Sequence, residues 1–221
     1  MRHAARRSRW LRHPACAILQ EMGLDSGDRA LIQIVDAALA EAARKSGQWL
    51  VCRVGCTQCC IGPFPISQLD ARRLRGGLAE LEARDPERGA LVRERARESV
   101  ARISSSFPGD PATGRLAENQ EAEEEFASFA DDEPCPALDP ETGACDLYAA
   151  RPITCRTFGP PVRCGSDAVG VCELCFVGAT DDEIAACEVE ADVEGLESTL
   201  VEELEQKAGV GGQTIVAFAL V

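Results

Sequence analysis

Apolar residues recur at helical spacing in residues 25–46, near the start of the chain. An apolar residue at every third or fourth position gives one continuous helix face, which here holds Leu31, Ile34, Val35, Ala38, Leu39 and Ala42. Asp25 or Ser26 is expected to cap this helix, because short polar side chains accept hydrogen bonds from unpaired backbone amides. Gly47 is expected to end it. The pattern therefore predicts an amphipathic helix with one buried face.

Two further helical patterns follow, in residues 66–85 and 86–106. Ser67 precedes Asp70 by three residues, which is the spacing of a helix N-terminal cap. Pro86 suits the first turn of a helix, where its missing amide proton has no partner to lose. Frequent Arg and Glu side chains at helical spacing indicate solvated outer faces. We therefore predict two consecutive helices here.

The later part of the chain predicts two more helices and a terminal element. Residues 115–133 are acidic and favour a helix, and residues 180–207 predict one long helix. Thr180 and Glu183 have the spacing of a capping box, and the acidic first turn suits the helix dipole. The last residues, 209–221, contain an apolar run that predicts a strand or a docked tail.

Proline and glycine interrupt residues 134–178, so this region predicts turns with one or two short helices. The expected fold class is mainly α, with several helices packed around a cysteine-rich, turn-rich region that binds metal. Three parts are expected: a basic, flexible arm at 1–24, a helical cysteine-cluster domain at 25–208, and a tail or strand at 209–221.

Charge and hydropathy exclude several classes of protein. The formal net charge of −14 repels phosphate backbones, so no nucleic-acid partner is expected. The charge is uneven, because residues 1–13 contain no acid and carry Arg2, Arg6, Arg7, Arg9 and Arg12. The late apolar run "TIVAFALV" is far shorter than the ~20 residues of a membrane span. The arm also lacks the apolar core of a secretory signal. We expect a soluble, cytoplasmic protein with no membrane partner.

Cysteine usage points to metal chemistry. The chain has 12 cysteines, and a cytoplasmic compartment would keep them reduced, so metal binding explains them better than disulfides do. Both histidines, His3 and His13, lie in the arm. A histidine-free folded part excludes Ser-His-Asp and Cys-His catalysis there, together with histidine-ligated metal sites.

The cysteine spacings suggest which thiolates bind the metal. Two C-x2-C pairs, Cys56–Cys59 and Cys172–Cys175, can each place two sulfurs on one metal ion. Adjacent side chains diverge, so one of Cys59 and Cys60 is a spare or the site holds more than one ion. Cys16 and Cys187 are expected only to pack. The predicted metal ligands are Cys52, Cys56, Cys59, Cys60, Cys135, Cys145, Cys155, Cys172 and Cys175.

Three arginines lie among these cysteines, at Arg151, Arg156 and Arg163. Clustered thiolates carry net negative charge, which a guanidinium can offset. The same side chains can instead cap nearby carbonyls or pair with surface acids. The sequence alone leaves both roles open.

The segments "CTQCC" and "CPALDPETGACDLYAARPITCRTFG" resemble the YkgJ-like CxxCxxCC family of cysteine-cluster proteins. The residues that match the family pattern are Cys56, Cys59, Cys60, Cys135, Pro136, Leu138, Gly143, Cys145, Tyr148, Arg151, Pro152, Cys155 and Arg156. The resemblance covers about residues 50–160 and implies a zinc- or iron-chelating domain. In the family pattern a cysteine stands three positions before Cys56, whereas Cys52 stands four before it.

That departure creates the C-x3-C-x2-C spacing of radical-SAM enzymes, in which three cysteines hold an iron–sulfur cluster. Those enzymes require repeated strand–helix units, which the pattern after Cys60 does not predict. Flagellin lysine methylases are related to the cysteine-cluster family, so a methyltransferase is a further alternative. The expected role is metal binding rather than catalysis, with zinc, iron or an iron–sulfur cluster as the bound group. All-thiolate sites suit each of these, so the sequence does not choose among them.

Overall fold

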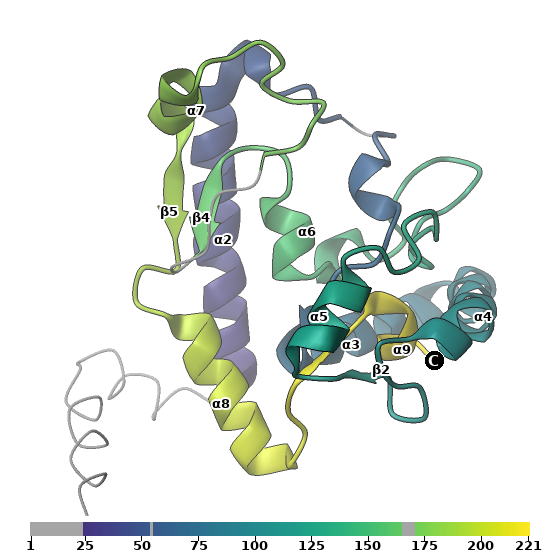
Figure 1. The fold of residues 1–221 in the computed structure, drawn as a ribbon. Helices are drawn as coiled ribbons and strands as arrows, with labels where there is room; N and C mark the ends of the chain where they lie inside the picture. The colour runs from purple at the N-terminus through teal and green to yellow at the C-terminus, as the bar shows by residue number, and fades with distance from the viewer. Residues whose placement is uncertain (1–23, 54, 165–170) are drawn as a thin grey trace, which may run out of the picture.

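The computed structural model describes residues 24–53, 55–164 and 171–221, and the fold is mainly α, as predicted. The predicted basic arm lies outside the described residues, except for Leu24. In Figure 1 the long helix α2 (Leu24–Ser46) stands beside two short strands and the helices α7 (Asp181–Cys187) and α8 (Leu196–Ala208). The other side of the molecule holds α3 (Gln68–Arg84), α4 (Pro86–Ile103), α5 (Gln120–Phe126) and α9 (Val216–Ala219).

Helix α2 confirms the predicted helix but not its predicted cap. Asp25 and Ser26 lie inside the first turn of a helix that already includes Leu24, so neither is the N-cap. The helix ends at Ser46, as predicted, and the 3-10 turn η2 (Gly47–Trp49) follows. Gly47 has a φ of 48°, a left-handed conformation that glycine adopts at little cost.

The buried face of α2 packs against α8 and a two-stranded parallel sheet. The sheet pairs β4 (Val162–Cys164) with β5 (Val189–Ala191). One apolar cluster joins the three elements and includes Leu31, Val35, Val162, Val189, Leu196 and Leu200. Leu200 is only 1% exposed. This cluster is the core of the α2 side of the molecule.

Helices α3 and α4 form the predicted consecutive pair. The Ser67 hydroxyl accepts a hydrogen bond from the Asp70 amide at 3.2 Å, which confirms the predicted cap of α3. Asp85 separates the helices and caps α4 by accepting from the Arg88 amide at 3.1 Å, directly before Pro86. The pair encloses a second apolar cluster, which includes Leu74, Leu78, Leu81, Val92, Ala96 and Leu220.

The end of the chain docks onto this second cluster. Strand β6 (Gln213–Thr214) pairs antiparallel with β1 (Ile66–Ser67), and α9 then packs against α3 and α4. Residues 209–221 thus contain both a short strand and a docked helix.

Residues 115–133 are less helical than predicted. Strand β2 (Gly109–Asp110) follows the 3-10 turn η4 (Ser104–Ser106) and pairs with β3 (Arg115–Leu116). Within residues 115–133 only α5 is α-helical. The Asn119 side chain caps α5 by accepting from the Ala122 amide at 2.9 Å. Turns follow α5. Ala130 has a φ of 52°, whereas residues of an α-helix have a φ near −63°. The predicted continuous helix is therefore wrong outside Gln120–Phe126.

The predicted single helix over residues 180–207 is also wrong, although its cap is confirmed. Thr180 and Glu183 form the predicted capping box at the start of α7. The chain then leaves α7 after Cys187 and forms β5, and a turn precedes α8. Asp192 and Gly195 have φ values of 54° and 68°, so the helical path is interrupted there. Pairing with β4 stabilises the strand between the two helices.

The region 134–178 is turn-rich where it is described, as predicted. Its regular elements are the turn η5 (Tyr148–Ala150), α6 (Ile153–Thr157), β4 and two isolated bridges. The described residues form three two-stranded sheets rather than repeated strand–helix units, so the barrel that a radical-SAM enzyme would require is absent from them. Within the same residues, no helix combines the length and apolar character needed to cross a bilayer.

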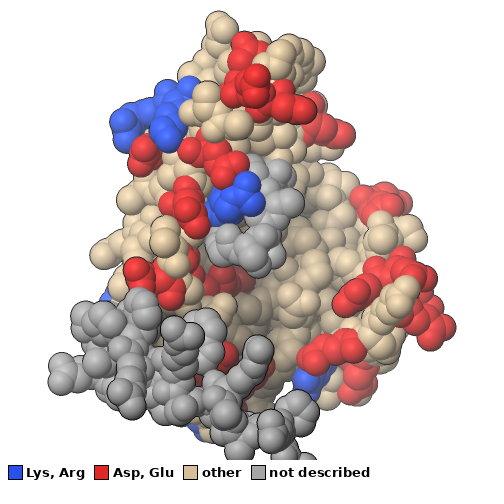
Figure 2. All heavy atoms as spheres, turned by 60° about the vertical axis from the view of Figure 1, so that its left-hand side comes forward, with Lys and Arg blue, Asp and Glu red and all other residues tan. Residues whose placement is uncertain are grey.

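Acidic side chains dominate the face shown in Figure 2, where Asp and Glu appear in several groups and Lys and Arg in few. This distribution agrees with the net charge of −14.

Candidate metal centre

The structure describes ten cysteine side chains, all of them free thiols, and among them are all nine predicted ligands. The tenth is Cys187, which is buried and donates a hydrogen bond to the Lys45 carbonyl at 3.3 Å, in keeping with a packing role. Cys16 lies outside the described residues. The nine predicted ligands fall into two groups that lie in different parts of the fold.

The first group, here called the five-thiol group, collects cysteines from three separate segments. The turn η3 (Gln58–Cys60) brings two of them, the Pro- and Gly-rich loops two more, and α6 the fifth. Backbone contacts join the segments, since the Cys135 amide donates a hydrogen bond to the Cys60 carbonyl at 2.7 Å. Within the second segment, the backbone of Cys145 forms an isolated antiparallel β-bridge with that of Leu138. The members are Cys59, Cys60, Cys135, Cys145 and Cys155.

The thiols of this group perturb one another's protonation. Burial raises the pKa of Cys135 to about 12, and it also raises the pKa of Cys155. In both cases neighbouring thiols of the group raise the pKa further. The pKa of Cys59 is lowered instead, chiefly because the Cys60 thiol donates a hydrogen bond to it. Donating that bond raises the pKa of Cys60 itself. The group therefore holds one favoured thiolate among thiols that prefer to stay neutral.

Helix α6, which carries Cys155, is attached to α3 by a buried carboxylate. Asp70 is 2% exposed, and its Oδ1 accepts a hydrogen bond from the Ile153 amide at 3.1 Å. Asp70 also pairs with Arg73, which bonds Asp28 of α2 at 2.5 Å. One ionic network therefore links α2, α3 and the helix that presents Cys155.

A partly buried arginine, Arg151, lies near the five-thiol group. Two guanidinium nitrogens of Arg151, Nε and Nη1, are buried and have no hydrogen-bond partner. The guanidinium stacks on the Tyr148 ring, with its central carbon 3.7 Å from the ring centre. Its charge acts on the thiols, because it contributes to the lowered pKa of Cys59 and opposes the raised pKa of Cys145.

The other two arginines have structural partners. Arg156 is buried and bonds the Arg151 carbonyl at 3.1 Å and Asp36 of α2 at 2.7 Å, so it fixes the loop that carries Arg151. Arg163 forms a two-point ion pair with Glu188, at 2.8 and 3.1 Å. The charge of Arg151 thus acts on the thiols, whereas Arg156 bonds a carbonyl and a carboxylate and Arg163 has an acidic partner.

The second group, here called the four-thiol group, collects cysteines from the two ends of the cysteine-rich sequence. Its members are Cys52, Cys56, Cys172 and Cys175. The Sγ atoms of Cys52 and Cys175 are 3.8 Å apart. Although Cys52 is exposed as a residue, partial desolvation of its thiol and the neighbouring thiols of the other three members together raise its pKa to about 12.

Backbone hydrogen bonds hold the four-thiol group together. The Cys175 amide donates to the Cys172 carbonyl at 2.8 Å, and the Phe176 amide donates to the Trp49 carbonyl at 3.0 Å. The first bond closes a turn between Cys172 and Cys175, and the second attaches this turn to the segment before Cys52. A side-chain bond of 2.6 Å from Gln58 to Glu173 adds a further tie.

Gly159 makes room for one of these sulfurs, a role that the sequence alone does not reveal. It has a φ of 121°, and a Cβ placed on it would lie 2.9 Å from Cys52 Sγ. Its carbonyl accepts a bond from the Cys172 amide at 3.4 Å. The following two prolines indicate a turn at this point, but nothing in the sequence points from Gly159 to Cys52, 107 positions away.

The two groups divide the first C-x2-C pair between them, because Cys56 lies with Cys52 while Cys59 lies with Cys60. Among the described residues, no three Cys, His, Asp or Glu side chains already stand in a finished metal-holding arrangement.

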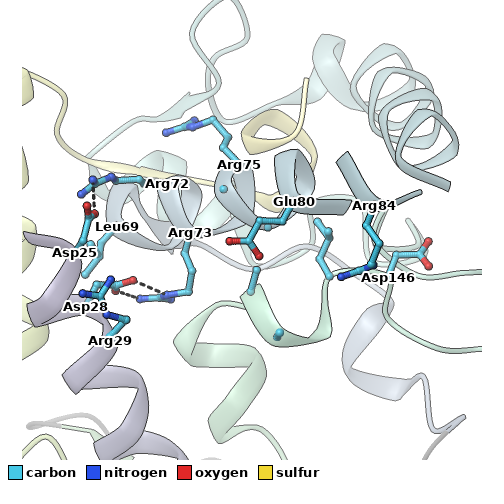
Figure 3. A pocket seen from close by; sticks show the side chains of 15 residues that line it. Asp25, Asp28, Arg29, Leu69, Arg72, Arg73, Arg75, Glu80, Arg84 and Asp146 are labelled. Atoms are coloured by element: carbon cyan, nitrogen blue, oxygen red, sulfur yellow. Dashed lines mark hydrogen bonds and ion pairs between the residues drawn. The ribbon is translucent and has the colours of Figure 1, made fainter. Parts of the chain in front are cut away.

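A polar cavity of about 690 Å³ lies between the start of α2, α3 and residues 146–150. Figure 3 shows that ion pairs cross it, from Arg72 to Asp25 at 2.6 Å and from Arg73 to Asp28. No cysteine lines this cavity. It is therefore separate from both thiol groups.

The fold and the site define a mainly helical protein with clustered thiols and no histidine in its described part. Residues 51–175 match the CxxCxxCC family, described as "Putative zinc- or iron-chelating domain". The match spans more than half of the chain, so the protein belongs to this family and the predicted resemblance is confirmed. It extends beyond the predicted range, as far as Cys175. No curated protein and no solved structure matches the chain.

Proposed function

We propose that the protein chelates zinc or iron through its clustered cysteine thiolates, with the five-thiol group as the principal centre. The observation that carries the proposal is the convergence of three separate segments on this group near Arg151, whose buried Nε and Nη1 atoms have no hydrogen-bond partner. Thiols that only packed would not require a cation. Membership of a family described as zinc- or iron-chelating supports the same role.

The electrostatics of the group suit a metal–thiolate centre. Four thiolates around a divalent ion carry a net charge of about −2, which a nearby guanidinium partly offsets. Arg151 provides that charge, and its buried Nε and Nη1 atoms are free to donate hydrogen bonds to sulfur. Most thiols of the group have a raised pKa, so metal binding would release protons and would weaken as the pH falls.

Within this proposal the residues have distinct roles. Cys59, Cys60, Cys135, Cys145 and Cys155 supply the thiolates, and Arg151 compensates their charge. Arg156 and Asp70 position the loop and the helix that carry Arg151 and Cys155. The bound metal would supply structural cross-linking, storage, or electron transfer where it forms an iron–sulfur cluster. The proposal also places the protein in the cytoplasm, where thiols stay reduced.

The test is elemental analysis and an absorption spectrum of the full-length protein, purified without oxygen. We expect stoichiometric zinc in colourless protein, or iron with a broad band near ~400 nm from an iron–sulfur cluster. The variant Cys155→Ser should lower both the bound metal and the melting temperature, because metal binding and folding are coupled in such loops.

Cys187→Ser is the matched control for the five-thiol group, since Cys187 is a buried cysteine that packs instead in the apolar cluster with Cys172 and Cys175. It should leave the metal content unchanged. Wild-type protein free of both metals, or Cys155→Ser protein with unchanged metal content and melting curve, would overturn the proposal for the five-thiol group.

A further inference from the structure

We propose that the polar cavity beside α3 binds a small molecule with two anionic groups, carboxylates or phosphates, and hydroxyl groups between them. Arg29 and Arg84 bind the two anionic groups, and Glu80 accepts hydrogen bonds from the hydroxyls. Figure 3 shows the two arginines at opposite ends of the lining, with Glu80 between them. No cysteine lines the cavity, so this proposal goes beyond the metal centre and does not rest on it.

The lining of the cavity is basic, although the protein as a whole is acidic. The chain has 37 Asp and Glu residues against 23 Lys and Arg, whereas the lining contains five arginines and four acids. Three of the four acids are already paired. Asp25 and Asp28 pair with arginines of the cavity, and Asp146 pairs with two arginines outside it. The positive charge left over favours an anionic ligand.

Three charged side chains of the lining have no partner. Arg29, Glu80 and Arg84 form no side-chain hydrogen bond or ion pair with any residue that the structure describes. Glu80 and Arg84 stand four residues apart with the acid first, which is the favourable order for an ion pair within a helix. In Figure 3 both lie on the same side of α3 as Arg73, whereas Arg75 points to the other side. Both groups are therefore available to a ligand.

Gly76 gives a second, independent indication of a ligand. Glycine inside a helix lowers its stability relative to alanine, and α3 contains two glycines in succession. Gly77 has a packing reason, because a Cβ placed on it would collide with the Ala150 side chain. Gly76 has no such reason, since a Cβ placed there would meet nothing within 4 Å. It lines the cavity, and its missing side chain leaves space that a ligand can fill.

The size and chemistry of the cavity define the class of ligand. Its volume of about 690 Å³ lies within the ~300–1,000 Å³ of small-molecule sites. A guanidinium presents a planar fork of donors that matches carboxylate and phosphate oxygens at two points. Arg29 and Arg84 can each bind one such group. A ligand with a single anionic group would leave one of them unpaired, and a carboxylate such as Glu80 accepts hydrogen bonds from hydroxyls.

The first experiment measures binding of three probes to the full-length protein by isothermal titration calorimetry at constant ionic strength. Glucarate carries a carboxylate at each end of a hydroxylated chain, and fructose 1,6-bisphosphate carries phosphates in the same places. Adipate matches glucarate in length but has no hydroxyls. We expect saturable binding of glucarate or of the bisphosphate, and adipate should bind about tenfold more weakly than glucarate.

The outcomes identify the anionic group of the ligand. Binding of glucarate alone supports carboxylate ends, and binding of the bisphosphate alone supports phosphate ends. If neither probe binds in a saturable way, the proposal is wrong. Adipate bound as tightly as glucarate would refute the role of Glu80.

Variants of the two arginines test the ends of the site. Arg29→Gln and Arg84→Gln should each weaken binding of the probe about tenfold or more, because each removes hydrogen bonds to a charged group. Arg44→Gln is the matched control, since Arg44 is an exposed arginine of the same helix as Arg29 and does not line the cavity. Equal affinity of the Arg29→Gln and Arg44→Gln proteins would overturn the proposal.

A variant of Gly76 separates binding from folding. Gly76→Leu fills the space at the cavity and replaces glycine by a better helix former, so the melting temperature should not fall. The affinity for the probe should nevertheless drop about tenfold or more. Ala79→Leu is the control, because Ala79 is an exposed position of α3 outside the cavity. Equal probe affinity of these two variants would refute the site.

The metal content of the same preparations keeps the two proposals apart. Wild-type protein that binds a probe but contains neither zinc nor iron would refute the five-thiol centre and support the anion site. Wild-type protein that contains metal but binds neither glucarate nor the bisphosphate would do the reverse.

Discussion

Arg151 offers the sharpest test of the five-thiol centre, because its effect should depend on whether metal is bound. Two of its buried nitrogens, Nε and Nη1, have no hydrogen-bond partner among the described residues. Replacing it by glutamine removes that unfavourable burial, which costs about 1–3 kcal/mol, and loses a stacking contact with Tyr148 of about 0.5–1 kcal/mol. The two effects oppose each other, so the metal-free protein should not become markedly less stable.

In the metal-loaded protein the same substitution should be costly. Hydrogen bonds to a charged group contribute about 1.5–3 kcal/mol, so Arg151→Gln should weaken metal binding roughly 10- to 150-fold. Arg151→Lys keeps the charge but not the planar fork, and we expect an intermediate loss. The assay is competition with a chromophoric chelator, together with urea unfolding of the metal-free and metal-loaded forms.

The comparison distinguishes charge compensation from ordinary packing. A guanidinium that only packs would destabilise both forms equally when it is replaced. Equal destabilisation of the two forms by Arg151→Gln, with an unchanged metal affinity, would refute the role of Arg151 as the counter-charge.

Further predictions concern the frame that holds the site. Leu200→Ala should lower the free energy of unfolding in urea by about 2–5 kcal/mol, since this side chain is 1% exposed in the core beside α2. Asp146→Asn should lower it by about 2–3 kcal/mol, because it breaks the 2.6 Å pair between a 1% exposed carboxylate and the partly exposed Arg95. The hydrogen bonds from Thr180 hold the pKa of Glu183 below its usual value, so the cap of α7 should be fully formed above the ordinary glutamate range and lost as the pH falls through the lowered pKa. Amide hydrogen exchange in α7 measures this, and Glu183→Gln should remove the pH dependence.

The helices that could be predicted are those whose apolar faces are long and uninterrupted. In α2 the buried Leu31, Val35 and Ala42 repeat at helical spacing, and that repeat alone specifies the packed face. Residues 180–207 have a similar composition, but there the backbone turns at Asp192 and Gly195. The strand β5 just before this turn forms because β4 lies alongside it, and that contact involves residues far away in the sequence.

The same limit applies to the candidate site. Composition and spacing identify the nine cysteines as candidate ligands, because so many thiols on a chain with so little histidine suggest metal. Their division into two groups separates Cys56 from Cys59 although these are only three residues apart, and the spacing does not predict this. The position of Arg151 among the cysteines makes it a candidate, but its lack of partners is visible only once the surrounding loops are in place.

The long sequence separation within the four-thiol group has a consequence for how the protein is made. Cys52 and Cys175 are 123 positions apart, and the family region closes only at residue 175. A ribosome that adds about 5–20 residues per second needs roughly 6–25 s to cover that distance. During this interval Cys52, Cys56, Cys59 and Cys60 are already synthesised while their partners are not. Maturation therefore includes an obligatory delay in which newly made thiols are open to oxidation and to the wrong ion.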